Sequence, residues 1–119
     1  SLAEDCTENA VLQYIACQMQ YAMDFGVDSI LQIYKAQLTE GTDFFFSPER
    51  GLPLGLTRIL AHLQQNGVIR SEKPAEDICR EILVISRGVL YNWCQCKGNY
   101  DLKAFALELV SNYLKSYTA

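Results

Sequence analysis

The chain has 119 residues, of which 50% are hydrophobic and 20% charged, and its formal net charge is −4 at pH 7. This length suits one domain over residues 1–119 with its own core, and the negative charge disfavours a protein that grips nucleic acid by itself, because phosphate contacts need Lys and Arg. No stretch is apolar enough for a membrane span and the N-terminus lacks a signal-peptide pattern, so we expect a cytoplasmic protein with no membrane partner.

The first predicted helix covers residues 7–25 and ends at Gly26, a residue type that commonly follows a helix. It carries no formal charge between Glu8 and Asp24, which predicts a largely buried helix. Gln18 lies in its apolar arc among aromatic residues, an arrangement suited to orienting an apolar small molecule. Alternatively, Gln18 bonds to a backbone group within a closed core. The predicted pocket residues are Tyr14, Gln18, Tyr21, Phe25 and Tyr34.

A second helix is predicted from a cap at Asp28 to about Leu38, with Tyr34 on its inner face. The short turn at Gly26 predicts an antiparallel hairpin with the first helix. Residues 41–54 then hold two prolines and three consecutive phenylalanines at residues 44–46, which break regular structure. This loop is either a lid over the pocket mouth or a plain cover for the core.

A third helix is predicted over residues 54–66 and ends at Gly67. It carries the only histidine, His62, on its solvent side. A single exposed histidine supports no Ser/His/Asp or Cys/His catalytic arrangement. Glycine-rich phosphate loops and metal-ligand spacings are also absent from the sequence, so neither an enzyme nor a cofactor or metal is predicted.

The cysteines form neither an even set nor a CxxC pattern. Two of them, Cys94 and Cys96, point to nearly opposite sides of one helix and cannot chelate the same metal. We therefore predict reduced, buried thiols, with a redox sensor as the alternative. The five cysteines are Cys6, Cys17, Cys79, Cys94 and Cys96.

A long helix beginning at Pro74 and a final helix capped by Asp101 carry the strongest apolar pattern, and each is apolar on two adjacent sectors. The bulkier sector of the long helix is assigned to the core: Ile78, Ile82, Ile85, Val89 and Trp93. The second sector predicts a dimer interface: Leu83, Ser86, Leu90, Cys94, Val110, Leu114 and Tyr117. We expect an all-α five-helix bundle whose last two helices form a four-helix interface with a second copy.

Residues 86–93 (SRGVLYNW) and 98–102 (GNYDL) resemble the end of the effector-binding domain of TetR/AcrR-family transcriptional regulators. Residues 63–70 (LQQNGVIR) are similar to that family's basic step into the same long helix. The resemblance implies a dimeric domain whose small-molecule ligand alters the DNA affinity of a separate helix-turn-helix domain. That domain has no counterpart in this sequence, which begins without Met as a fragment would, so DNA would be bound only through a domain absent from this chain.

Three functional classes remain open. The favoured class is the ligand-binding and dimerisation domain of a regulator, a homodimer that binds an apolar or aromatic effector. The second class is a dimeric helical protein-interaction module without a small-molecule ligand. The third class, an enzyme or redox protein, requires chemistry that these residues do not display.

Overall fold

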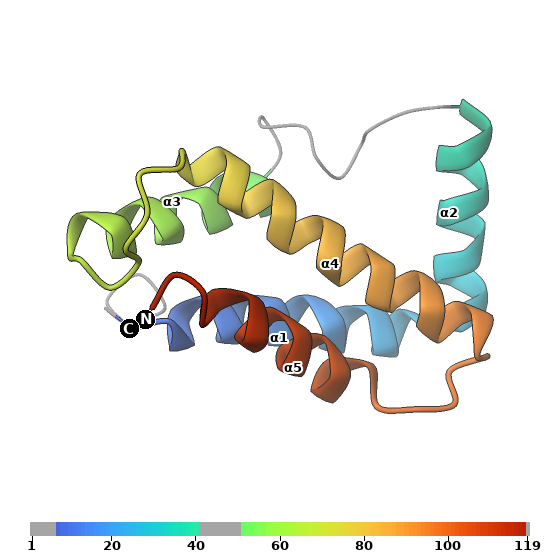
Figure 1. Cartoon of the computed structure of the whole chain (residues 1–119). Coiled ribbons are helices and arrows are strands. Elements are labelled where there is room, and N and C mark those ends of the chain that lie inside the picture. The colour runs from blue at the N-terminus through green and yellow to red at the C-terminus, as the bar shows by residue number, and fades with distance from the viewer. Residues whose placement is uncertain (1–6, 41–50, 119) are drawn as a thin grey trace.

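A computed structural model describes residues 7–40 and 51–118 of the chain. Within these residues there are five α-helices and no strand, which confirms the predicted all-α class (Figure 1). None of the helices combines the length and apolar character needed to cross a membrane. The helices are α1 (Asn9–Phe25), α2 (Val27–Glu40), α3 (Gly51–Gln65), α4 (Ala75–Gln95) and α5 (Leu102–Leu114).

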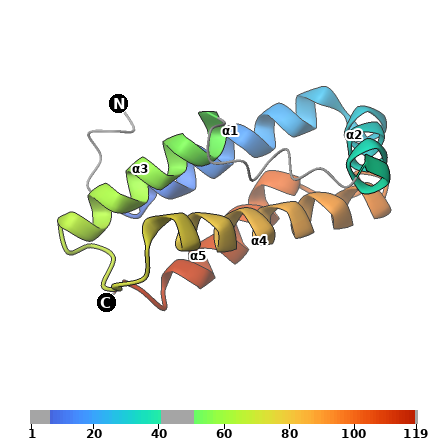
Figure 2. The ribbon, with the colours of Figure 1, turned by 90° about the horizontal axis from the view of Figure 1, so that it is seen from above.

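Helix α5 packs against both α1 and α4, and α3 packs against α4. Helix α2 stands upright across the far ends of α1 and α4, so that the view from above looks down its axis (Figures 1 and 2). The predicted antiparallel hairpin of the first two helices is therefore wrong. Gly26 alone joins them, with a φ of 95°, and an antiparallel helix pair needs a connection of about 2–5 residues to reverse the chain.

The core is built mainly from α1, α3, α4 and α5. Four of the five residues of the bulkier α4 sector are buried in the core, as predicted, namely Ile78, Ile82, Val89 and Trp93, whereas Ile85 is only partly buried. Trp93 also donates a hydrogen bond of 3.1 Å from Nε1 to the carbonyl oxygen of Tyr100, which ties α4 to the turn that follows it. Each fully buried aliphatic side chain, such as that of Ile78 or Ile82, contributes roughly 1.5–3 kcal/mol to folding.

The turn between α4 and α5 places the last helix against the body. Lys97 and Gly98 both have positive φ, and Gly98 donates from its main-chain nitrogen to the Trp93 carbonyl oxygen at 2.9 Å. The Asp101 side chain accepts a hydrogen bond of 3.1 Å from the Ala104 main-chain nitrogen, which confirms the predicted cap.

The residues predicted to meet a second copy lie mostly inside the protomer. Val110 and Leu114 have no exposed surface, and Leu83, Ser86 and Cys94 are buried. The physical reason is that α5 lies against both α1 and α4, so the side of α5 that carries Val110 and Leu114 is covered by the same chain. Leu90 and Tyr117, the other two predicted contacts, are partly exposed. These side chains therefore do not form the exposed face that the predicted interface requires.

Helix α1 is buried along one stripe only, although its lack of charge predicted a largely buried helix. Its buried residues recur at helical spacing, while Gln13, Cys17 and Tyr21 are exposed. Tyr21 is 69% exposed and Phe25 is 47% exposed. The exposed surface of α1 thus includes two aromatic rings at the end where α2 begins.

Candidate functional site

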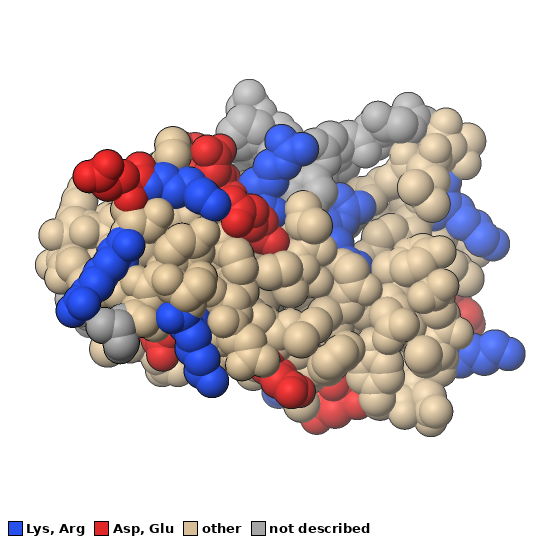
Figure 3. Space-filling view, viewed as in Figure 1, with Lys and Arg blue, Asp and Glu red and all other residues tan. Residues whose placement is uncertain are grey.

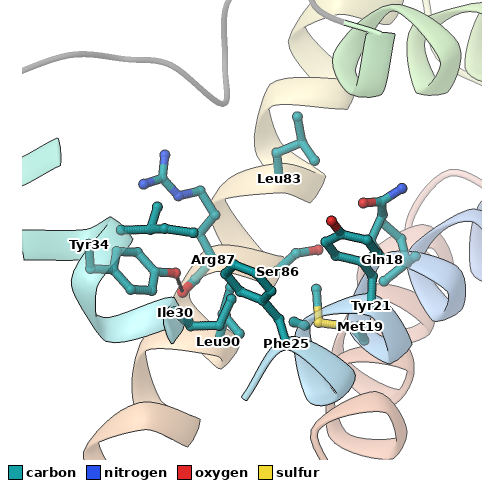
Figure 4. A pocket seen from close by; sticks show the side chains of 13 residues that line it. Gln18, Met19, Tyr21, Phe25, Ile30, Tyr34, Leu83, Ser86, Arg87 and Leu90 are labelled. Carbon is teal, nitrogen blue, oxygen red and sulfur yellow. Dashed lines mark hydrogen bonds between the residues drawn. The ribbon is translucent and has the colours of Figure 1, made fainter. Parts of the chain in front are cut away.

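A cavity of about 260 Å³ lies in the angle that α2 makes with α1 and α4 (Figure 4). The upright position of α2 creates it, because a helix lying flat against α1 would fill the same space. Its volume lies just below the range of about 300–1,000 Å³ typical of small-molecule sites, so it suits a compact ligand. The lining residues are Ile15, Gln18, Met19, Tyr21, Ala22, Phe25, Ile30, Ile33, Tyr34, Leu83, Ser86, Arg87 and Leu90.

The α1 wall ends in an aromatic edge that opens to solvent. Residues three and four apart share a helix face, and this spacing brings Gln18, Ala22 and Phe25 to the cavity. The rings of Tyr21 and Phe25 stack with their centroids 6.2 Å apart and their planes inclined by 19°. A ligand bound here would cover part of both rings and remove apolar surface from water.

Gln18 supplies a polar group within this wall. Its side chain is half-buried, and no group in the described part of the chain forms a hydrogen bond with its amide. The described residues therefore do not form the alternative arrangement, in which the Gln18 amide bonds to a backbone group within a closed core. A neutral amide that offers both donors and an acceptor can orient a ligand that has one polar group.

The α2 wall is fixed to α4 by Tyr34. Its hydroxyl donates a hydrogen bond of 3.0 Å to the main-chain oxygen of Arg87. Burial raises the pKa of Tyr34, while the hydrogen bond and charge of Arg87 act in the opposite direction. The hydroxyl thus stays protonated at neutral pH and acts as a donor.

Arg87 is the one charged side chain among the described residues that line the cavity. Its guanidinium carbon lies 5.6 Å from the centroid of the Tyr34 ring, and its Nη2 donates to Oε1 of Gln37. Sequence reasoning missed both Arg87 and Gln37. The sequence feature that could have indicated Arg87 is its position at the border of the apolar arc of α4, between Leu83 and Leu90 in sequence.

Four of the five predicted pocket residues line the cavity: Gln18, Tyr21, Phe25 and Tyr34. Tyr14 does not, because its ring packs against α3 at Gly55, where an added Cβ would come within 2.7 Å of the tyrosine hydroxyl. Burial raises the pKa of Tyr14, and Cys79 adds to this. The phenylalanines at residues 44–46, considered as a lid, lie outside the described residues.

Three residues predicted to form a dimer interface instead line this cavity, namely Leu83, Ser86 and Leu90. Ser86 is buried, and its hydroxyl donates to the main-chain oxygen of Ile82 at 2.9 Å. Its polarity is thus satisfied within α4, and its small size leaves space in the cavity.

Other reactive residues lie away from the cavity. His62 is half-buried on α3, with its Nε2 3.2 Å from Nδ2 of Asn66. Cys79 and Cys94 are buried, and burial raises the pKa of both thiols, whereas Cys17 and Cys96 are exposed. The prediction of buried thiols thus holds for two of the four described cysteines. In residues 7–40 and 51–118, no three His, Cys, Asp or Glu side chains are grouped so that they could hold a metal ion.

No protein-family model, curated protein or solved structure matches this chain. The resemblance to TetR/AcrR regulators therefore rests on residues 63–70, 86–93 and 98–102 alone. These segments cover the end of α3 with the residues that follow it, the second half of α4, and the turn that leads into α5. The cavity between α1, α2 and α4 is an independent feature on which a function can be argued.

Proposed function

We propose that this chain is the small-molecule-sensing and dimerisation domain of a TetR-like transcriptional regulator that acts in the cytoplasm. The observation that supports it best is the cavity of about 260 Å³ lined by aromatic rings, in which Gln18 offers an amide without a hydrogen-bond partner in the described residues. Apolar walls with a few oriented polar groups are typical of ligand sites. DNA would be bound by a separate domain.

Ligand binding would act through the angle between α1 and α2. These helices are joined by Gly26 alone, and α2 is held to α4 by the hydrogen bond of Tyr34 to Arg87. A ligand between the three helices contacts all of them, so it would favour the arrangement that fits it best. It can change DNA affinity only to the extent that it binds two arrangements with different affinities.

The ligand-binding part of the proposal is tested with the neutral aromatic probe 1-naphthaleneacetamide. A probe at a hundred times its dissociation constant should stabilise the wild-type fold by about 2.7 kcal/mol, which thermal unfolding detects. The substitution Ala22→Leu places a larger side chain in the cavity wall and should abolish the stabilisation. Ala36→Leu makes the same change at an exposed position of α2 outside the lining and should leave it intact. Equal stabilisation of both variants would contradict binding in this cavity.

Dimerisation would use a different face from the one that the sequence indicated. Val84 and Tyr91 of α4 are 54% and 46% exposed, and exposed Gly88 lies between them at helical spacing. Figure 3 shows that the centre of the molecular face bearing α4 and α5 is free of Lys, Arg, Asp and Glu. Val84, Gly88 and Tyr91 form an uncharged stripe bordered by Arg80 and Glu81 one turn away on α4, and a stripe of this kind can pack against its own copy across a two-fold axis.

Gly88 gives this face a specific feature. A glycine inside a helix costs roughly 0.5–1 kcal/mol relative to alanine. An added Cβ at Gly88 would meet no atom within 4 Å, so the packing of the described protomer does not require a glycine there. If a helix from a second copy approaches α4 closely at this point, it requires a glycine there, because a larger side chain would keep the two backbones apart. The same face also supports the second candidate function, a dimeric interaction module, which would dimerise but bind no small molecule.

A further inference from the structure

Gln18 brings an unused hydrogen-bonding group to the cavity. Its side chain belongs to the lining and is half-buried, and no group in the described part of the chain forms a hydrogen bond with its amide. A primary amide carries N–H donors and a carbonyl acceptor side by side on one planar group. A ligand atom that reaches this amide can therefore meet a donor and an acceptor at the same place.

The other buried or half-buried polar residues of the lining already bond within the protein. The hydroxyls of Tyr34 and Ser86 donate to main-chain oxygens at 3.0 and 2.9 Å. The Arg87 guanidinium donates to the side chain of Gln37. Of these groups in the described chain, the neutral Gln18 amide is thus the one left to recognise a polar atom of a ligand.

The remainder of the cavity wall is apolar and partly aromatic. In Figure 4 the side chains of Phe25, Ile30 and Leu90 lie towards the side of the cavity away from Gln18. Aromatic rings such as that of Phe25 pair with flat rings by stacking or by edge-to-face contact. A ligand that fills about 260 Å³ between these groups would have a flat apolar body and a polar edge at Gln18.

We infer that the cavity binds a compact, neutral, flat heterocycle whose edge places an N–H donor beside an acceptor, as an aromatic lactam does. The lactam N–H would donate to Oε1 of Gln18 and its C=O would accept from Nε2, with the ring against Phe25. A glutamine amide reads an adjacent donor and acceptor in this paired manner on the edge of a base. This inference rests on the proposed ligand-binding function and names its ligand class.

A matched pair of probes tests the inference, namely the bicyclic lactam 2-quinolone and the lactone coumarin, which has an oxygen in place of the lactam N–H. The two are neutral and nearly identical in shape, so they differ at Gln18 mainly in the donor. NMR titration of the 119-residue chain should show that 2-quinolone binds roughly three- to tenfold more tightly, the range of one neutral hydrogen bond. Equal wild-type affinities would overturn the inference, while the ligand-binding function tested with 1-naphthaleneacetamide stands.

Two variants assign the preference to Gln18. Gln18→Met keeps an unbranched side chain of similar size without the amide, so it should abolish the preference for 2-quinolone, and a cooperative thermal transition reports that it is folded. Gln13→Met makes the same change at an exposed position of α1 outside the lining and should keep the preference. A preference that survives in Gln18→Met, or that both variants lose equally, would overturn the inference. Failure of 2-quinolone, coumarin and 1-naphthaleneacetamide alike to bind the wild type would overturn the proposed function as well.

Discussion

Tyr34 on α2 donates a hydrogen bond of 3.0 Å to the main-chain oxygen of Arg87 on α4, and the Arg87 guanidinium lies over the ring of the same tyrosine. The two residues are 53 positions apart in the chain. This contact joins α2 to α4, together with the hydrogen bond from Arg87 to Gln37 and the edge-to-face packing of Tyr34 on Tyr91. Tyr34 therefore fixes the shape of the cavity as well as lining it.

Removing the Tyr34 hydroxyl should loosen α2. Tyr34→Phe keeps the buried ring and loses the hydrogen bond, so we expect a loss of about 0.5–1.5 kcal/mol in the free energy of unfolding. Urea unfolding followed by circular dichroism measures it. Tyr21→Phe removes a hydroxyl from an exposed ring of the same cavity and should cost close to nothing. Equal effects of the two substitutions would contradict the role assigned to Tyr34.

The turn before α5 should tolerate no side chain at Gly98. Gly98 and Gly67 have nearly the same positive φ, 73° and 75°, so Gly→Ala at either position incurs a conformational cost of roughly 1–2 kcal/mol. An added Cβ at Gly98 would also lie 2.9 Å from Cγ2 of Val27, whereas one at Gly67 would meet nothing. Gly98→Ala should therefore lower the melting temperature more than Gly67→Ala, and the reverse order would contradict the packing of this turn against the start of α2.

A polar cluster joins the segment before α4 to both final helices and should make stability depend on pH. Lys73 Nζ lies 2.9 Å from Oε2 of Glu81 and 3.1 Å from the Tyr117 hydroxyl, and the Tyr113 hydroxyl donates to Oε1 of Glu81 at 2.9 Å. Hydrogen bonds from Lys73 first, and then from Tyr113, hold the pKa of Glu81 below its usual 4.5. The Glu81 hydrogen bond in turn raises the pKa of Lys73.

Because the folded pKa of Glu81 is depressed, its contribution to stability is complete above pH 4.5 and is lost as the pH falls through the folded pKa. Glu81→Gln should therefore destabilise the protein at pH 7, and the difference from wild type should shrink towards pH 3. Glu76→Gln, at an exposed position near the start of α4, is the matched control. A difference between Glu81→Gln and wild type that stays constant from pH 7 to pH 3 would show that the carboxylate charge of Glu81 is unimportant.

The proposed dimer face predicts that two different substitutions on α4 weaken the dimer. Val84→Glu should convert a dimer into a folded monomer, because the new carboxylate would be buried without a partner. Gly88→Ala should stabilise the isolated protomer by roughly 0.5–1 kcal/mol and weaken the dimer by preventing close approach. Sedimentation velocity measures both, with Gln13→Glu on exposed α1 as the control for added charge. A monomeric wild type, or a dimer unaffected by Val84→Glu, would rule out this face.

The helices could be predicted from local patterns, whereas their partners could not. Helical periodicity, the cap at Asp101 and the glycine at position 26 are properties of neighbouring residues, and the structure confirms the helices that they predict. The direction of α2 depends on the backbone angles of Gly26, which no side-chain pattern encodes. Likewise, an apolar sector on a helix predicts burial but does not identify the covering element. The sequence pattern therefore predicts a second copy at Val110 and Leu114, although both are fully buried within the protomer, where α5 packs against α1 and α4.

The residues of the candidate site divide in the same way, into those that a local sequence pattern predicts and those that only the packing of the helices brings together. Gln18 could be recognised because a polar residue in an apolar arc stands out in one helix. Arg87 could not, since an arginine at the edge of an arc is usually solvated, and only the position of α2 brings Gln37 and Tyr34 against it. Spacing groups Tyr14 with Gln18, yet in the structure the Tyr14 ring packs against α3 at Gly55 and is partly buried there, outside the cavity.

Chemical-shift mapping with 1-naphthaleneacetamide tests the central claim, a ligand site between α1, α2 and α4, most directly. In ¹H–¹⁵N spectra of the 119-residue chain, saturable shifts should concentrate at cavity positions such as Gln18, Ala22, Ile30 and Ser86. The amide of Leu60, buried on α3 away from the cavity lining, should not move. Shifts that do not saturate, or that leave Gln18 and Ser86 unchanged while other helices respond, would contradict the account.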